Sequence, residues 1–171
     1  MFDIKQLPQR ALCDTGFWIR ALGERPGDVR SPDAIAFFEE MKANGRELLI
    51  AAPSLAELIR GNQAFKVPST LSVIVVPFDR LAAEVLGKKF SADVIKQQRK
   101  ANGYEKAYIQ YDAMIIACAI RHKADCIISF DTNVFEDAEN LEIPIHKPKN
   151  FKLPLLRDLP AGIAKAPTGG D

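Results

Sequence analysis

Short apolar runs alternate with helix-periodic segments along most of the chain. Runs that are apolar at nearly every position are typical of strands that are covered on both faces, and they occur at 11–13, 48–51, 71–76 and 126–129, with a short fifth run at 143–145. Helical patterns are predicted between them, at 15–22, 32–42, 54–60, about 79–96 and about 113–120. Strands separated by helices indicate an α/β fold, a three-layer α/β/α sandwich with a mainly parallel sheet of four to five strands.

The stretch from Ala113 to Ile120 is apolar at every position. It predicts a helix that is buried on nearly all sides, and it places Asp112 in the first turn of that helix. A helix N-terminus favours a negative charge, so an isolated acid there often has only a structural role. With further acids nearby, the same position is suited to holding a cation.

The length of 171 residues suits one compact domain, which we expect to span residues 1–150. From Phe151 onward, proline and glycine become frequent and the apolar residues lose their period. Residues 151–171 are therefore predicted to form a Pro/Gly-containing C-terminal arm that is partly disordered.

Charge and cysteine content limit the class of protein. Lys plus Arg number 23 against 22 for Asp plus Glu, so the net charge gives no signal for nucleic acid or membrane binding by the whole molecule. Cys13, Cys118 and Cys126 are odd in number and lack C-x-x-C spacing, which favours core thiols in the cytoplasm over disulfides or zinc. No signal peptide is evident, and no apolar run approaches the roughly 18 residues that a membrane span needs.

Four acids fall at equivalent places in the predicted sheet. Asp14 ends the first strand, Glu57 follows the second in the first turn of its helix, Asp112 opens the buried helix, and Asp131 follows the fourth strand. Strand C-termini and the helices that follow them share one edge of a parallel sheet, where such folds bind ligands. We therefore expect the four carboxylates to converge.

Each acid also has a structural interpretation. Asp14 fits a helix cap, Ser54-x-x-Glu57 a capping box, and Asp131 a turn. If the four carboxylates converge, a purely structural role for each becomes less favoured, since two carboxylates about 4 Å apart repel by roughly 4 kcal/mol at an effective dielectric near 20. Protons or cations must then be present, and an all-oxygen site suits Mg²⁺ or Mn²⁺ and phosphoryl chemistry.

The residues around these acids form an ordered set. Asp14-Thr15 follows a strand, Glu57 lies in Ser-Leu-Ala-Glu-Leu, Asp112 begins Asp-Ala-Met-Ile-Ile-Ala-Cys-Ala, and Asp131 lies in Ser-Phe-Asp-Thr-Asn. In order and spacing the set resembles the PIN-domain nucleases over residues 10 to 148, in particular the VapC-like toxin ribonucleases of VapBC toxin–antitoxin pairs. Ser129 stands where that family often has Thr, and Asn133 where many members carry a further Asp.

The resemblance implies cleavage of RNA phosphodiester bonds with Mg²⁺ or Mn²⁺. All four acids would be catalytic and metal-binding, with Asp14 and Asp112 as the principal ligands and Glu57 or Asp131 orienting the attacking water. Thr15, Ser129 and Asn133 would support them. A toxin of this kind implies an antitoxin protein that covers the acidic edge, and a homodimer.

RNA contacts are predicted for one basic segment and one arginine. The set, which also fits a solvated helix end and loop, consists of Arg60, Lys96, Arg99, Lys100, Tyr104 and Lys106. His122 and His146 indicate no metal site. Two alternatives stay open: a PIN-like binding or regulatory module without catalysis, and another magnesium-dependent phosphohydrolase. A haloacid-dehalogenase-like phosphatase is disfavoured because it needs a second Asp where Gly16 stands.

Overall fold

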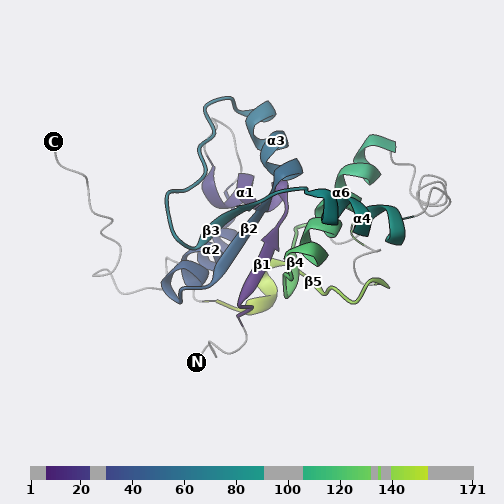
Figure 1. Ribbon diagram of the computed structural model, residues 1–171. Helices are drawn as coiled ribbons and strands as arrows, with labels where there is room; N and C mark the ends of the chain where they lie inside the picture. The colour runs from purple at the N-terminus through teal and green to yellow at the C-terminus, as the bar shows by residue number, and fades with distance from the viewer. Residues whose placement is uncertain (1–6, 24–29, 91–105, 132–134, 136–139, 154–171) are drawn as a thin grey trace, which may run out of the picture.

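A computed structural model describes residues 7–23, 30–90, 106–131, 135 and 140–153, leaving out the side chains of 106–108. One or two described helices follow each of the first three strands along the chain (Figure 1). In order they are β1 Arg10–Cys13, α1 Thr15–Leu22, α2 Pro32–Ala43, β2 Glu47–Ala51, α3 Ala52–Gly61, β3 Val73–Val76, α4 Arg80–Lys89, α6 Lys106–Arg121, β4 Cys126–Ile128, β5 Ile145–His146 and the 3₁₀ helix η3 Pro148–Phe151.

The five strands form one sheet in the order β3-β2-β1-β4-β5, and every neighbouring pair is parallel. The central strand β1 pairs with both β2 and β4, which brings Cys13 level with Ile50 and Ile128. The chain segments that leave these three strands therefore begin side by side at one edge of the sheet. This is the edge at which the sequence predicts the acids.

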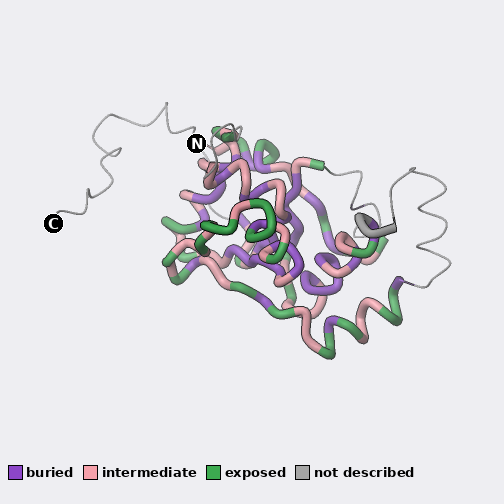
Figure 2. Tube along the Cα trace, turned by 90° about the horizontal axis from the view of Figure 1, so that it is seen from above, coloured by how far each residue is buried: buried purple, intermediate pink, exposed green. Residues whose placement is uncertain are grey.

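Alternating residues of the central strands point to opposite faces of the sheet and contribute to two separate hydrophobic cores. Ala11, Cys13, Leu48 and Ile50 face a core that is completed by α1, α2 and Phe151. Leu12, Leu49 and Ile127 face a second core built with α6, and with Ala82 of α4. Helices thus cover both faces of the sheet, and the most buried part of the chain runs through the middle of the molecule (Figure 2). The predicted three-layer α/β/α sandwich is confirmed.

The first two helices match their predicted start signals. Asp14 caps α1, and the backbone N–H of Phe17 donates to its side chain over 2.6 Å. Ser31 caps α2 ahead of Pro32, as the sequence predicts. That helix ends at Ala43, one residue beyond the predicted Lys42, and Asn44 is its C-cap.

The prediction for 71–76 is wrong in two respects. Strand β3 begins at Val73, and Leu71, which the prediction includes in the strand, is 99% exposed. β3 is also an edge strand that pairs only with β2, and it is not covered on both faces, since Val75 is exposed. A continuous apolar run does not distinguish an edge strand from a central one.

The helix predicted over 79–96 is shorter than expected. Asp79 caps it as predicted, through a hydrogen bond from the N–H of Ala82 over 2.9 Å. The helix ends at Lys89, with Phe90 as its C-cap. Smaller shifts occur in β4, which ends one residue before Ser129, and in β5, which lies two residues later than predicted.

The C-terminal arm begins inside the fold. Phe151 is buried, its ring lies 4.8 Å from that of Phe37, and Leu153 packs against the same core. The remainder of the predicted arm, 154–171, lies outside the described residues.

Cys13, Cys118 and Cys126 are free and buried, as predicted. Burial raises the pKa of the Cys118 thiol and that of the Cys126 thiol to about 12, so both stay protonated at neutral pH. In the part of the chain that is described, no helix combines the length and apolar character needed to cross a membrane.

Candidate active site

Asp14 lies at the junction of β1 and α1, at the centre of the sheet edge. Its Oδ1 accepts the N–H of Phe17, and its Oδ2 accepts the hydroxyl of Ser129 over 2.5 Å. The carboxyl group is buried, and this burial is the main reason why its pKa rises from 3.8 to about 6 despite the two hydrogen bonds. Asp14 is therefore a helix cap, as one interpretation predicts, and its carboxyl group faces the predicted site as well.

Ser129 connects the first acid to the fourth. It follows β4 directly and is fully buried, and its Oγ accepts the backbone N–H of Asp131 over 3.0 Å. Asp131 itself is exposed, and its charge contributes to the raised pKa of Asp14. The predicted support of the site by Ser129 thus has a physical form: one hydroxyl group fixes both Asp14 and the backbone that carries Asp131.

Glu57 comes from α3, although not as the sequence predicts. The helix begins at Ala52, so Glu57 lies in its second turn, and the N-cap, Ala51, makes no side-chain cap hydrogen bond. Ser54 is inside the helix and fully buried, and among the described residues its Oγ has no partner. The capping-box interpretation is therefore wrong. β2 runs directly into α3, and Pro53 is tolerated in the first turn because the N–H that it lacks would be unpaired there.

The Glu57 side chain is instead held by α1. Thr15 Oγ1 donates to Glu57 Oε2 over 2.5 Å, which joins the residue after Asp14 to the second acid. Arg60, one turn further along α3, brings its Nη2 within 3.9 Å of Glu57 Oε1 but is largely exposed. The predicted supporting residue Thr15 thus fixes Glu57 relative to Asp14.

Asp112 is not in the first turn of its helix. α6 begins at Lys106, six residues earlier, so the predicted stabilisation by the helix N-terminus does not apply. The pKa of Asp112 rises from 3.8 to about 8, first because the carboxyl group is desolvated and then because of the charges of Glu57, Asp14 and Asp131. Without a compensating cation, Asp112 is largely protonated at neutral pH.

The four acids Asp14, Glu57, Asp112 and Asp131, here called the acidic cluster, therefore gather at one edge of the sheet, within electrostatic range of one another. They do not form a finished metal centre. Among the described residues, no three His, Cys, Asp or Glu side chains are arranged closely enough to hold a metal ion as they stand. The cluster concentrates negative charge at the place where a parallel α/β sheet binds ligands.

Arg20 is a cation near the cluster that is not among the predicted site residues. Its guanidinium group donates to the carbonyl oxygen of Gly16 over 3.2 Å, lies 4.6 Å from the centre of the Phe130 ring, and lowers the pKa of Asp14 in part. Gly16 leaves room for this contact, because a Cβ atom there would lie 3.1 Å from Arg20 Nη1. The signal in the sequence is spacing: Arg20 is four residues after Gly16 and on the same side of the helix.

The predicted RNA-binding residues are described only in part. Arg60 is exposed beside Glu57. Lys106 begins α6, and its side chain is outside the described part. Asn133 and the other four basic-segment residues, Lys96, Arg99, Lys100 and Tyr104, also lie outside it.

Comparisons with known proteins show the family and the fold of the chain. The model of the PIN domain family matches residues 11–141, which span all four acids. One chain of the crystal structure of VapBC2 from Rickettsia felis bound to a DNA fragment from their promoter has a similar fold, with a TM-score of 0.52, 14% sequence identity, and coverage of 80% of this chain and 97% of that one. No curated protein sequence matches the chain.

Proposed function

Because the chain belongs to the PIN domain family, a family of nucleases, we propose that it is an endoribonuclease that uses Mg²⁺ or Mn²⁺ to hydrolyse RNA phosphodiester bonds. The observation that carries the proposal is the acidic cluster, in which burial and mutual repulsion raise the pKa of Asp112 to about 8. A carboxyl group held in this way costs stability when it is ionised, and a bound divalent cation removes that cost.

The chemistry of the cluster fits a hard divalent cation. Its donors are carboxylate oxygens, which Mg²⁺ and Mn²⁺ prefer, whereas the three cysteine thiols are buried elsewhere in the cores. Asp14 and Asp112 would be the principal ligands, and Glu57 and Asp131 would complete the set. When bound, the ion supplies positive charge that neutralises these acids and polarises a phosphodiester group.

The side chains around the acids act mainly by positioning. The Phe17 N–H and the Ser129 hydroxyl orient the two oxygens of Asp14, and Thr15 orients Glu57. Ser129 also anchors the backbone at Asp131. Either Glu57 or Asp131 would orient a water molecule for in-line attack on phosphorus and take its proton, while the opposite P–O bond breaks and the leaving oxygen takes a proton from solvent.

Substrate phosphates need positive charge close to this acidic edge. The described residues supply Arg20, whose guanidinium group is fixed on Phe130, and the exposed Arg60. We include Lys96, Arg99, Lys100, Tyr104 and Lys106 in the proposed RNA contacts because the sequence predicts that they precede the buried helix. Arginine suits this role because its planar guanidinium group binds phosphate oxygens in pairs.

The test is RNA cleavage by the wild type and by Asp112→Asn, with EDTA, Mg²⁺ or Mn²⁺. We expect metal-dependent cleavage by the wild type and a loss of at least about 100-fold in the variant, which keeps the size of the side chain but not its charge. Asp79→Asn is a matched control on a capping Asp outside the cluster and should retain cleavage. Equal activity of wild type and Asp112→Asn would contradict the catalytic assignment and favour a binding module.

The same proposal includes a biological setting. The fold similarity to a chain of VapBC2 supports a role as the toxin of a toxin–antitoxin pair, with an antitoxin protein as partner. The proposal also includes a homodimer, which the resemblance implies, and a cytoplasmic location, which the three free cysteines favour. Expression of the wild type should then arrest growth, while expression of Asp112→Asn should not. A light-scattering mass near that of two chains would support the dimer, and harmless expression of an active nuclease would remove the toxin role alone.

A further inference from the structure

A cavity of about 670 Å³ opens between α3, α4 and α6. Its walls are apolar and aromatic, with Phe78, Phe90, Tyr111 and Met114 among the lining residues. Gln110, which is exposed, adds a side-chain amide, and Tyr111 adds a hydroxyl group. The volume lies within the range of pockets that enclose small organic ligands.

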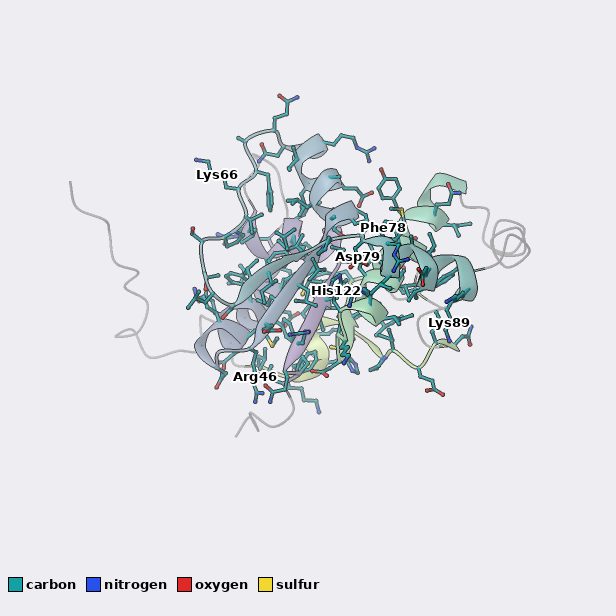
Figure 3. All side chains as sticks on the ribbon, viewed as in Figure 1. Arg46, Lys66, Phe78, Asp79, Lys89 and His122 are labelled. Carbon is teal, nitrogen blue, oxygen red and sulfur yellow. The ribbon has the colours of Figure 1, made fainter. Side chains whose placement is uncertain are left out.

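The cavity adjoins the acidic cluster. Ala56, which precedes Glu57 on α3, lines it, and so do both chain neighbours of Asp112 on α6. The charge of Glu57 raises the pKa of Asp112, so these two helices approach each other at this point. Figure 3 shows Phe78 beside Asp79, on the side of the molecule where α4 and α6 lie, and Arg46 at the opposite end.

The lining differs from the cluster in one decisive property. Among the described residues, those that line the cavity include no acid and no base. A phosphate group has nothing to pair with there, and a charged peptide side chain would lose its hydration without compensation. The walls suit a flat, uncharged group with hydrogen-bonding edges.

We propose that this cavity binds one nucleobase of the RNA substrate and thereby selects the nucleotide next to the cleaved bond. The inference rests on the proposed ribonuclease function, since the acidic cluster would hold the phosphate of the same nucleotide. Single-stranded RNA is recognised in this way, by stacking of an unpaired base on aromatic rings and by hydrogen bonds to its edge. Tyr111 and the two phenylalanines supply rings, and the Gln110 amide supplies a donor and an acceptor.

Gly87 provides a way to close the cavity without removing any contact. It lies on α4 and lines the cavity, and a Cβ atom built there meets no atom within 4 Å. Gly87 is exposed, so Gly87→Leu places a bulky apolar side chain at the rim of the cavity without a clash, and replacing a helical glycine also favours the helix. Gly87→Ala is the matched control, because it makes the same backbone change with a side chain too small to block a base.

The first experiment measures binding of adenosine, guanosine, cytidine and uridine by NMR titration in EDTA, with ribose as the control that lacks a base. These probes are uncharged, so the acidic cluster does not repel them. We expect one nucleoside or more to bind the wild type at least about tenfold more tightly than ribose, in line with the free energy of base–aromatic stacking. Gly87→Leu should weaken that binding by about tenfold or more, and Gly87→Ala by less than about twofold.

The second experiment measures cleavage of four homopolymeric 12-mer RNAs with Mn²⁺. Gly87→Leu should raise KM for the preferred RNA and reduce the preference, whereas Gly87→Ala should preserve both. Equal binding of nucleosides and ribose would overturn the inference, as would matching behaviour of the two Gly87 variants. A Gly87→Leu protein that has lost only the binding of a protein partner would also overturn it, and would assign the cavity to that partner.

Failure of the two proposals can be told apart. Asp112→Asn should abolish cleavage and leave nucleoside binding within about twofold of the wild type, because it keeps the neighbouring cavity walls. A wild-type protein that binds nucleosides in a Gly87-dependent way but cleaves no RNA would contradict the ribonuclease function and support the base site. RNA cleavage without any nucleoside binding would contradict the base site and support the ribonuclease function.

Discussion

Two aspartates cap helices in this fold, and their electrostatic surroundings are opposite. Asp14 caps α1 and Asp79 caps α4, and each accepts a backbone N–H three residues further on, over 2.6 and 2.9 Å. The pKa of Asp79 is lowered, first by that backbone hydrogen bond, whereas the pKa of Asp14 is raised to about 6. In the same capping motif, the surroundings therefore stabilise the ionised form of Asp79 and destabilise the ionised form of Asp14.

The difference comes from what surrounds each cap. Arg121 Nη2 lies 3.1 Å from Asp79 Oδ2, and His122 is close to it as well (Figure 3). Asp14 is buried and faces Asp131, with Arg20 as a partial compensation. A cap by itself thus says nothing about function. A cap whose negative charge is raised in energy by burial and by other acids is a candidate for binding a cation.

The largest expected effect on stability is that of Asp112→Asn in the absence of metal. With a pKa near 3.8 unfolded and about 8 folded, Asp112 keeps its proton in the native state while the unfolded chain loses it. Its contribution to the free energy of unfolding is therefore fully present below about pH 4 and is lost as pH rises to 8. At pH 9 the free energy of unfolding of Asp112→Asn should exceed that of the wild type by a few kcal/mol, since one pKa unit corresponds to about 1.4 kcal/mol.

Urea unfolding in EDTA at pH 4, 6 and 9 measures this difference. Asp79→Asn is the control with the opposite sign: the pKa of Asp79 is lowered, so its charge stabilises the fold above the unfolded pKa, and its removal should destabilise the protein at pH 9. If both variants lose stability equally at pH 9, the claim that ionised Asp112 destabilises the fold is contradicted.

Addition of Mn²⁺ should produce the next largest effect. A cation that binds only the native state stabilises it by about 2.7 kcal/mol at a free concentration of 100 times Kd, or roughly 5–10 °C in Tm for a chain of this size. The rise should be larger at pH 8 than at pH 5, because Asp14 and Asp112 must release protons to bind the ion. Thermal melts at both pH values provide the measurement.

The matched variants make this result specific. Asp14→Asn and Asp112→Asn should abolish the rise in Tm, while Asp79→Asn should keep it, although Asp79 is also a capping aspartate. A rise that persists in both cluster variants would place the ion elsewhere, and no rise in the wild type would favour a module that does not bind metal.

Ser129→Ala should have a smaller effect, both on the stability of the fold and on its affinity for Mn²⁺. It removes the hydroxyl that donates to Asp14 Oδ2 and accepts the N–H of Asp131, which should cost about 1–2 kcal/mol because both groups lose a partner. The pKa of Asp14 should rise above 6, since that hydrogen bond lowers it. Mn²⁺ affinity should fall by about tenfold or more.

Ser129→Thr tests the interpretation, because it keeps the hydroxyl group. Titration of Asp14 by NMR and Mn²⁺ binding by calorimetry should return toward the wild type in this variant. If Thr and Ala behave alike, tight packing around the buried Ser129 accounts for the loss, and the hydrogen bond does not.

The sequence predicts the layers of this fold well because the strands are mainly apolar and three of the helices, α1, α2 and α4, have a capping residue as a start signal. Asp14, Ser31 and Asp79 are capping residues that are recognisable without a structure, and all three cap helices. β3 is predicted less well because its position at the sheet edge depends on the strand order, which is a property of the whole chain. Leu71 is apolar but exposed, because it lies in the turn before the strand.

The same limit applies to the acids. Their gathering at one sheet edge follows from parallel topology and is predictable, but their places within helices are not. Glu57 and Asp112 each lie deeper in a helix than predicted, because α3 starts directly after β2 and α6 starts at Lys106, where no capping residue marks the boundary in the sequence. The spacing of Arg20 from Gly16 is visible in the sequence, but the contact of Arg20 with Phe130 depends on tertiary packing and could not be predicted from the pattern.

The smallest effect is expected for Arg121→Gln, which makes the surroundings of Asp79 more like those of Asp14 without burying it. The pKa of Asp79 should rise toward its ordinary value, because both the hydrogen bond and the charge of Arg121 lower it. Since a lowered pKa stabilises the fold fully above the unfolded pKa of about 3.8 and loses this effect as pH falls through the folded pKa, the variant should be slightly less stable at pH 7 and should approach the wild type at the lower of two pH values. Urea unfolding at the two pH values measures this, and 0.5 M NaCl should shrink the difference at pH 7 because the pair is partly exposed.

Mn²⁺ binding should not change. A loss of Mn²⁺ binding in Arg121→Gln would mean that the two capping aspartates are coupled, and that the contrast between them is not a contrast between two independent sites.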